Sequence, residues 1–208
     1  MIRNEIIDTI FEKRRSYKFF TTEPVSDEIL ETVLMCGRIA PTAMNRQPWH
    51  FTVIKSSEAM EEFGRDLIEN ADKYGPFGPP PGSLPPGGPQ AGGPPPMQNA
   101  NMTPAERTRN APLMIIVSGD SREMAAHIDC PLAMENMLLA AVSLGLDTGW
   151  DFGVNKDFFE GPGGAEYKRK YKIPDGYKAY CACYFGYRDK SQPIRDRGPR
   201  KEGTITIF

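Results

Sequence analysis

The sequence predicts an α+β fold, a sandwich in which one mixed, mainly antiparallel β-sheet is flanked by helices. Segments with helical spacing of apolar residues alternate with short strand-like runs, and the regular strand–helix–strand array of a parallel sheet does not appear. At 208 residues the chain can bury one sizeable core but not two. We therefore expect a single domain over residues 1–208.

Four amphipathic segments are expected to be helices. Isoleucines recur on one face over residues 2–13, which predicts a helix that ends before a run of basic residues. Ser26 is placed as the N-cap of a second helix, which stops before Pro41. Helical spacing also predicts helices over 57–70 and near 156–171.

Strands are predicted where β-branched and aromatic residues gather in short runs. These runs are 50–55, 112–120 and 178–186, with a short strand and turn over 146–155. Between the strand 112–120 and the region 146–155 lies an unusually apolar helix, for which we expect Asp129 as the N-cap and Gly145 at the C-terminal cap position. Its composition predicts burial at the centre of the molecule or at an interface.

One segment departs from this pattern, a Pro/Gly-rich insertion at about 75–104. The chain contains 20 prolines and 20 glycines, and residues 75–96 consist mostly of these two types. No packed core can form from such a composition, so a spacer is the first interpretation. A ligand for a proline-binding domain, a cover for an active-site mouth and a wrap around another subunit remain open alternatives.

Charge, hydropathy and cysteine content limit the class of protein. A net charge of -2 gives no reason to expect nucleic acid or an anionic membrane as a partner, and no apolar run is long enough to cross a bilayer. The first residues form a charged, amphipathic segment without a signal-peptide core, so we expect a cytoplasmic protein. The four cysteines are expected to be reduced and mostly buried: Cys36, Cys130, Cys181 and Cys183.

Several common active-site motifs are absent from the sequence. It contains no Gly-rich dinucleotide or phosphate loop, no nucleophile elbow and no zinc-protease helix. The only histidines, His50 and His127, match no zinc-binding pattern, so no metal site is predicted. We expect His50, which opens a strand, to be structural.

Two short stretches carry the candidate chemistry. The first is the basic turn, residues 14–18, with three cations and a serine hydroxyl that suit a terminal phosphate; alone, it could equally be a solvated helix end. The second is the amide loop, residues 40–49, in which Asn45 and Gln47 each offer a donor and an acceptor of the kind that the edge of a flavin requires. By itself the amide loop could be a plain helix-to-strand turn with a packed Trp49.

Taken together, in this order and spacing, the two stretches resemble the nitroreductase family. Members of that family have a basic RRSxR-like turn near the N-terminus and a PSxxNxQPW-like loop some 25 residues later. The segment LGLDTGWDFG, which follows the apolar helix, is similar to another family segment, and the arginine-bearing C-terminal arm, residues 190–208, extends the resemblance. Residues 71–105 are not covered by it.

The resemblance implies a cofactor, FMN, and a set of residues that bind it. Arg14, Arg15, Ser16 and Lys18 would hold the phosphate and ribityl oxygens. Within the same site, further contacts are implied for Thr42, Asn45 and Gln47 across a dimer interface, for the stretch from Trp150 through Phe152 to Gly153 along the ring, with a backbone N–H near Gly153 at N5, for Arg107 at the pyrimidine edge, and for Arg197 and Arg200 at the phosphate.

Three departures from the family pattern bear on this site. Lys18 replaces the usual second arginine and Thr42 the common serine, and both changes keep the chemistry. Phe152 stands where some members carry an acid near the flavin. In the region 71–105 relatives have helices that line the substrate channel, so the resemblance carries no acceptor specificity.

The implied activity is hydride transfer from NADH or NADPH to a small organic acceptor such as a nitroaromatic or a quinone. Donor and acceptor would use one pocket in turn, in a ping-pong mechanism, within a homodimer that shares its active sites and exchanges its C-terminal arms. No side chain is nominated as catalytic, because the cofactor performs the chemistry and the protein positions it. The alternatives are a flavin-dependent dehalogenase, a flavin-fragmenting relative, and a non-catalytic scaffold that uses the Pro-rich segment.

Overall fold

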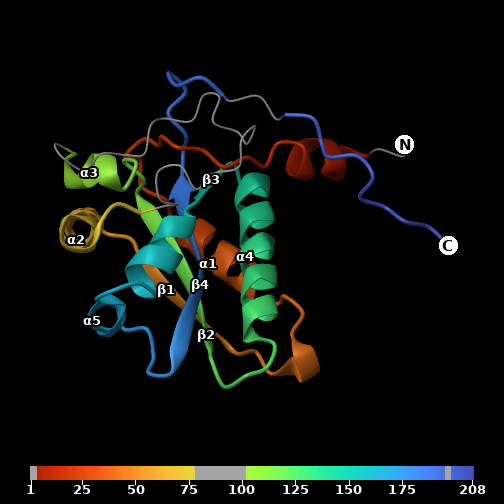
Figure 1. The fold of residues 1–208 in the computed structure, drawn as a ribbon. Helices are drawn as coiled ribbons and strands as arrows, with labels where there is room; N and C mark the ends of the chain where they lie inside the picture. Colours follow the sequence, from red (N-terminus) through yellow and green to blue (C-terminus); the bar gives the residue numbers. More distant parts are fainter. Residues whose placement is uncertain (1–3, 78–101, 195–197) are drawn as a thin grey trace.

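A computed structural model describes residues 4–77, 102–194 and 198–208. They form one antiparallel sheet with helices on both faces (Figure 1). The helical elements, in chain order, are η1 (Ile7–Phe11), α1 (Asp27–Arg38), η2 (Ala43–Asn45), α2 (Ser57–Tyr74), α3 (Pro104–Arg107), α4 (Ala126–Ser143), η3 (Val154–Phe159) and α5 (Gly164–Lys170). The strands are β1 (Trp49–Ile54), β2 (Leu113–Asp120), β3 (Asp147–Trp150) and β4 (Tyr177–Gly186).

The strands are arranged in the order β1-β2-β4-β3, and every pair among the described strands is antiparallel. The sequence predicts a mixed, mainly antiparallel sheet, whereas the described strands pair only in antiparallel fashion; an isolated parallel bridge joins Ser16 to Thr148 on β3. The register between β2 and β4 shifts between Val117 and Ser118, so Tyr180 is an extra residue on β4. β1 and β3 are the edge strands.

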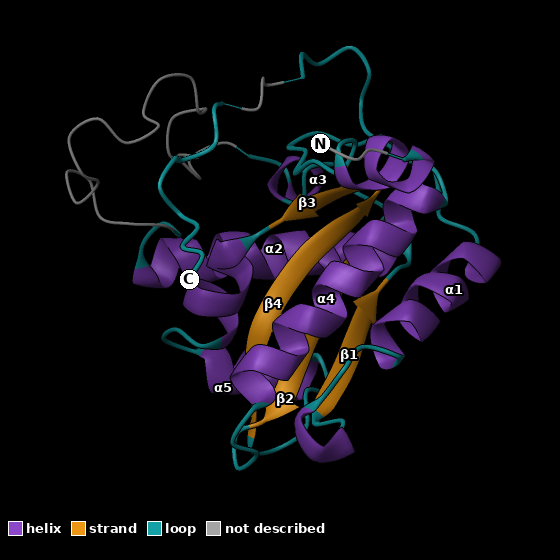
Figure 2. Ribbon diagram, turned by 90° about the vertical axis from the view of Figure 1, so that its right-hand side faces the viewer, coloured by secondary structure: helices purple, strands orange, loops and turns teal. Residues whose placement is uncertain are grey.

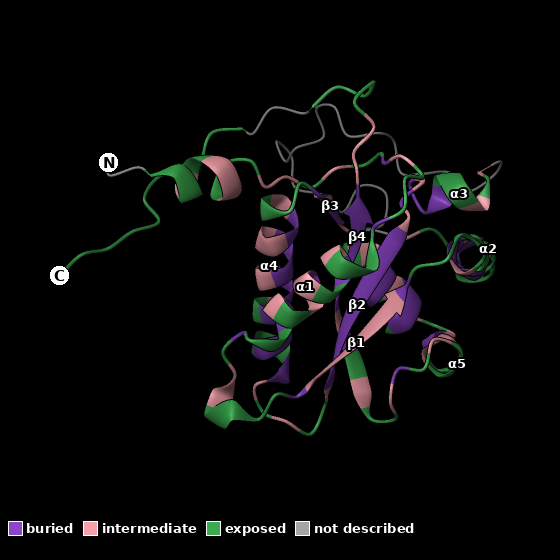
Figure 3. Ribbon diagram, turned by 180° about the vertical axis from the view of Figure 1, so that it is seen from behind, coloured by how far each residue is buried: buried purple, intermediate pink, exposed green. Residues whose placement is uncertain are grey.

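Alternate residues of the central strands enter two separate cores. Ile115 and Val117 pack toward α1 and α4, whereas Met114 and Ile116 pack toward α2, η3 and α5. Figure 2 shows α4 lying across the sheet with α1 beside it, and Figure 3 shows that β2 and β4 are buried along most of their length. The burial of both sheet faces explains why β2 reads as a continuous apolar run rather than an alternating one.

Several predicted boundaries are confirmed. The Ser26 hydroxyl accepts a hydrogen bond from the Ile29 N–H at 3.3 Å and caps α1, which ends at Arg38. Gly145 has a φ of +81°, and the Leu146 N–H donates to the Ala141 carbonyl at 2.8 Å, which closes α4 in a Schellman motif.

Other boundaries were wrong. α4 begins at Ala126, not at Asp129, which is instead buried inside the first turns of the helix. The helix expected near 156–171 is divided into η3 and α5, because glycines and a proline over residues 161–164 interrupt it. Next to the expected end of the insertion, at about residue 104, Thr103 caps the short helix α3 through a capping box with Glu106. Most of the Pro/Gly-rich segment, 78–101, lies outside the described residues.

The first predicted helix is shorter than expected and its apolar face is not buried within this chain. η1 is a single π-helical stretch, and Ile6 and Phe11 beside it are 57% and 52% exposed. Ile2 lies outside the described residues. Figure 1 shows that η1 and the C-terminal arm both extend past α4, away from the sheet. These exposed apolar residues are candidates for contact with another chain.

Candidate functional site

The basic turn lies along β3, because its main chain forms hydrogen bonds with Thr148 of that strand. The Tyr17 N–H donates to the Thr148 carbonyl at 2.8 Å, and the Thr148 hydroxyl donates to the Arg15 carbonyl at 3.2 Å. The side chains of Ser16 and Lys18 are left exposed. The turn therefore presents cations and a hydroxyl from a fixed backbone, as a phosphate site requires.

The two arginines of the turn point into different surroundings. Arg14 Nε is 3.7 Å from a carboxylate oxygen of Glu135 on α4, a long and weak ion pair. Arg15 lines a cavity of about 670 Å³ together with Tyr17, Asp147 and Arg188. Burial raises the pKa of the Asp147 carboxyl, although the Arg188 N–H donates a hydrogen bond to it at 3.0 Å. Neither Asp147 nor Arg188 is among the predicted site residues: Asp147 lies within the LGLDTGWDFG segment without a predicted role, and Arg188 belongs to no motif.

The amide loop has a strained backbone that is held from within. Met44, Asn45 and Gln47 have φ values of 52°, 53° and 47°, in the left-handed region that side chains other than glycine rarely adopt. The Thr42 hydroxyl accepts a hydrogen bond from the Gln47 N–H at 3.2 Å, and the Gln47 amide donates to the Asn45 amide oxygen at 3.0 Å. Both amide side chains are exposed and share one small surface.

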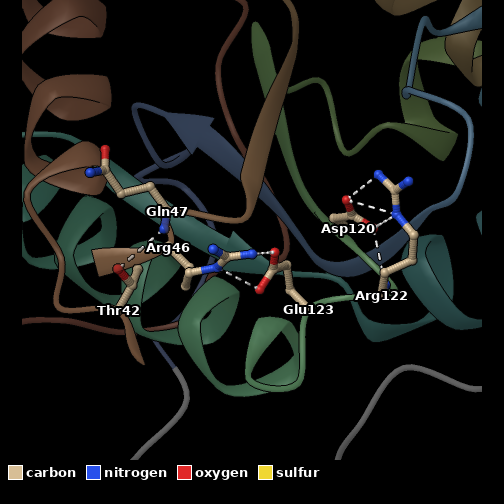
Figure 4. A network of polar contacts seen from close by, with 6 residues as sticks. All are labelled: Thr42, Arg46, Gln47, Asp120, Arg122 and Glu123. Atoms are coloured by element: carbon tan, nitrogen blue, oxygen red, sulfur yellow. Dashed lines mark hydrogen bonds and ion pairs between the residues drawn. The ribbon is translucent and has the colours of Figure 1, made fainter. Parts of the chain in front are cut away.

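Two contacts from the start of α4 hold the amide loop from outside. The Ala43 N–H donates to both carboxylate oxygens of Asp129 at 3.3 Å, which explains why that acid is buried. Arg46 forms a forked pair with Glu123, with distances of 3.0 Å and 2.5 Å (Figure 4). Hydrogen bonds from Arg46 lower the pKa of the Glu123 carboxyl. In Figure 4 the Gln47 side chain points away from this pair.

The basic turn and the amide loop lie at opposite ends of the sheet within one chain. The amide loop leads into Trp49, which pairs with Gly119 near the end of β2. The basic turn contacts Thr148, which is next to the Asp147–Gly186 pair at the other end of β4. Figure 1 shows the same separation. A single chain therefore does not bring the two predicted groups together.

The stretch 150–153 follows β3 on the same side as the basic turn. Trp150 is partly buried against the core on the α4 face, whereas Phe152 is 61% exposed. A Cβ on Gly153 would lie 3.0 Å from the Cβ of Phe77, so this backbone is closely covered on one side. A glycine here allows the main chain to approach its neighbour.

Arg107 is the predicted site residue with the most unusual environment. It is only 6% exposed, and its Nε has no hydrogen-bond partner among the described residues. Its guanidinium lies 4.6 Å from the centre of the Phe77 ring. A buried guanidinium nitrogen that lacks a partner among the described residues is costly, and a bound anionic ligand could satisfy it.

Of the two arginines predicted from the C-terminal arm, Arg197 lies outside the described residues and Arg200 is exposed in the arm. Elsewhere, His50 packs edge-on against Tyr177 at 6.4 Å. All four cysteines are unpaired, three of them buried and Cys36 half-buried.

Within residues 4–77, 102–194 and 198–208, no three histidine, cysteine, aspartate or glutamate side chains gather as metal ligands would. No helix in the same ranges combines the length and apolar character that a membrane crossing demands.

Comparison with known proteins gives a consistent result. The sequence profile described as "Nitroreductase family" matches residues 11–187. A protein of Methanothermobacter thermautotrophicus named "Putative NADH dehydrogenase/NAD(P)H nitroreductase" is 26% identical over 198 residues, which cover 92% of this chain and 82% of that protein. The chain belongs to the nitroreductase family.

Solved structures support the same fold. The crystal structure of a nitroreductase with bound FMN from Bacteroides fragilis superposes on this chain with a TM-score of 0.71 at 24% identity. The match covers 99% of this chain and 100% of that one. An FMN-bound nitroreductase from Desulfitobacterium hafniense also gives a TM-score of 0.71 at 24% identity, with 100% of both chains covered. The predicted fold class, a nitroreductase-like α+β sandwich, is thus confirmed.

Proposed function

We propose that the protein is an FMN-dependent oxidoreductase that takes hydride from NADH or NADPH and passes it to a small organic acceptor. The observation that carries the proposal is the bridge between Ser16 and Thr148, which joins the basic turn to β3 and so to the stretch 150–153. The proposed phosphate donors of the basic turn thus lie at the same end of the sheet as the stretch 150–153, whose glycine-containing backbone suits a flat ring. Family membership and the FMN-bound relatives support the same cofactor.

The donor set fits FMN. Guanidinium groups and a hydroxyl on a fixed turn suit a phosphate monoester, and the orphaned Nε of Arg107 suits a ligand that gains negative charge. Bound FMN supplies the chemistry of accepting and returning a hydride equivalent. In the proposal Arg15 and Ser16 hold the phosphate, the Gly153 backbone orients the ring, and exposed Phe152 offers an apolar face to a flat acceptor.

We propose further that the active site is shared between two copies of the chain. Because the basic turn and the amide loop are at opposite ends of one sheet, they can meet on one ligand only if each comes from a different copy. A two-fold axis that brings α4 against its copy would join them, and α4 presents exposed apolar side chains for this contact, Ile128 at 54% and Leu132 at 42%.

The C-terminal arm is proposed to cross to the partner copy. Residues 204–208 alternate threonine and isoleucine before a final phenylalanine, a strand-like pattern, and Ile205 and Ile207 are 81% and 89% exposed. The edge strand β1 has no partner on its outer side among the described strands, and an open groove of about 660 Å³ lies between it and α1, lined in part by Met35 and Phe51. A strand added by the C-terminal arm of a second copy would cover the free edge of β1 and the groove beside it.

One absorption experiment tests the proposed function. The purified protein should carry the yellow flavin spectrum, lose it on anaerobic addition of NADH or NADPH, and regain it when a quinone or nitroaromatic is added. Initial rates at several acceptor concentrations should give parallel double-reciprocal lines, as a ping-pong mechanism requires. A colourless protein that cannot be reconstituted with FMN would refute the proposal and favour the scaffold alternative.

Substitutions in the basic turn test the phosphate assignment. Arg15→Ala and Ser16→Ala should each weaken FMN binding by about 1.5–3 kcal/mol, the usual value of a charge-assisted hydrogen bond. Arg65→Ala is the control, because Arg65 is an exposed cation on α2 that pairs with Glu61 and belongs to neither the basic turn nor the amide loop. Unchanged FMN affinity in both basic-turn variants would show that the phosphate binds elsewhere.

Reductive dehalogenation is a second candidate function. An iodotyrosine deiodinase of Danio rerio is 30% identical over 71 residues, a match that covers 34% of this chain and 24% of that protein. Halide release from an iodinated or brominated phenol during turnover would favour this reaction, whereas turnover with quinones alone would favour the first.

The four unpaired cysteines are consistent with the reducing cytoplasm, which we propose as the location.

A further inference from the structure

A buried ion pair between Arg109 and Asp151 lies next to the proposed flavin site, and neither residue is among the predicted site residues. The guanidinium NH2 of Arg109 is 2.6 Å from the Oδ2 of Asp151, and the two side chains are only 8% and 12% exposed. The residues are 42 positions apart in the sequence, in the loop after α3 and in the turn after β3.

Arg109 joins three parts of the fold with one side chain. Besides Asp151, its NH1 donates to the Tyr17 carbonyl of the basic turn at 3.4 Å. The guanidinium carbon lies 4.8 Å from the centre of the Tyr184 ring on β4, in cation–π geometry. The planar fork of arginine can serve these partners together, which a lysine ammonium cannot do.

The backbone around Arg109 is held in an uncommon conformation. Arg109 and Asn110 have φ values of 61° and 56°, two consecutive left-handed residues that are not glycine. The Arg109 carbonyl accepts a hydrogen bond from the Phe20 N–H at 3.0 Å, just beyond the basic turn. Such strain persists only where the surroundings enforce it, and it gathers at functional sites.

Asp151 fixes the start of the stretch 150–153 from its own side. Its N–H donates to the Ala182 carbonyl on β4 at 2.9 Å, and its Oδ1 accepts from the Val154 N–H at 3.2 Å. The carboxylate therefore spans the turn that contains Phe152 and Gly153. One oxygen sets the turn and the other is held by Arg109.

We propose that Arg109 and Asp151 are positioning residues that hold the Phe152–Gly153 backbone at a fixed distance from the basic turn, so that a ring bound there is aligned for hydride transfer. This inference rests on the proposed function. The pair does not contact the ligand; it acts through the basic turn on one side and through the 151–154 turn on the other. A displacement of about 1 Å between these two supports is enough to slow a hydride transfer about 10²-fold.

Two single variants and one double variant test the proposal in the holoenzyme. Arg109→Lys keeps the charge but loses the fork, and Asp151→Asn keeps the shape but loses the charge. Asp151→Asn lowers stability because the buried Arg109 cation loses its partner, and Arg109→Lys lowers it because the ammonium cannot make both hydrogen bonds of the fork. The double variant Arg109→Met with Asp151→Leu replaces the pair by apolar groups and restores stability while leaving the two supports unlinked.

The first readout is the rate of anaerobic flavin reduction by NADH or NADPH in stopped flow, with FMN affinity measured in parallel. All three variants should reduce flavin about 10²-fold more slowly, with a smaller change in FMN affinity, since the phosphate donors are intact. Glu61→Gln is the matched control, because it weakens the Glu61–Arg65 pair on α2, which is also 2.6 Å long but solvent-exposed and outside both the basic turn and the amide loop. A folded double variant that reduces flavin at the wild-type rate would overturn the proposal.

A second readout needs no cofactor and separates this proposal from the proposed function. In the apoprotein, hydrogen exchange of the Gly153 and Val154 amides should be faster in the three variants than in the wild type and unchanged in Glu61→Gln. Unchanged exchange would refute the positioning role even if the wild-type protein is an active flavoenzyme. A wild-type protein that binds no FMN would instead refute the proposed function.

Discussion

Gly149 on β3 offers the sharpest test of how the basic turn is seated. A Cβ at this position would be 2.5 Å from the Tyr17 carbonyl oxygen and 3.1 Å from Arg109 NH1. The first neighbour is backbone and is held by the 2.8 Å hydrogen bond from the Tyr17 N–H to Thr148, so it cannot rotate away. Gly149→Ala must therefore push the basic turn off β3.

The cost of Gly149→Ala follows from these contacts. Overpacking a fixed site costs about 1–3 kcal/mol, and the loss of one backbone hydrogen bond adds about 1 kcal/mol. For a domain of this size, a total of about 2–4 kcal/mol lowers the melting temperature by roughly 5–15 °C. FMN affinity should fall as well, because the phosphate donors move with the turn.

Thermal unfolding followed by circular dichroism, with and without FMN, measures both effects. Gly198→Ala is the control, since a Cβ at that exposed position has nothing within 4 Å. If Gly149→Ala melted with the control and bound FMN as tightly as the wild type, the proposed seating of the basic turn on β3 would be wrong.

Three further predictions use other parts of the structure. Cys36 alone should react with iodoacetamide at pH 8, because burial raises the pKa of Cys130 and of Cys181 to about 12; labelling of either would contradict their burial. The pKa of Glu123 lies below its ordinary 4.5, so its pair with Arg46 should stabilise the amide loop above pH 4.5 and be lost as the pH falls through the lowered pKa. This loss should appear as a step in Trp49 fluorescence that is absent in Glu123→Gln. A step that survived in this variant would exclude the pair as its cause. Removal of residues 204–208 should shift the protein from dimer toward monomer in analytical ultracentrifugation at micromolar concentration, whereas an unchanged dimer would rule out the arm exchange.

The local signals in the sequence predicted most of the fold. Ser26 as an N-cap and Gly145 after a helix are determined by nearest neighbours, and both were placed correctly. β2 was found because it is a continuous run of apolar residues bounded by turn formers. The local pattern gave a wrong prediction at Asp129, whose residue type is typical of an N-cap. Its carboxylate instead accepts a hydrogen bond from the Ala43 N–H, 86 positions away.

The candidate site shows the same division. The basic turn and the amide loop could be recognised because each is contiguous. Arg109 and Asp151 could not, because an ion pair across 42 positions leaves no trace in local spacing. Nor does periodicity reveal that the two recognised stretches lie at opposite ends of one sheet; that follows only from the strand order and register.

The central claim is that the basic turn of one copy and the amide loop of another form one FMN site. Two defective variants test it directly: Arg15→Ala with Ser16→Ala, and Asn45→Ala with Gln47→Ala. In a mixed dimer one of the two sites would receive both intact halves. After unfolding together and refolding, the account predicts recovery of about one quarter of the wild-type flavin-reducing activity, from random pairing in a two-fold dimer. No recovery above that of the separate variants would contradict it.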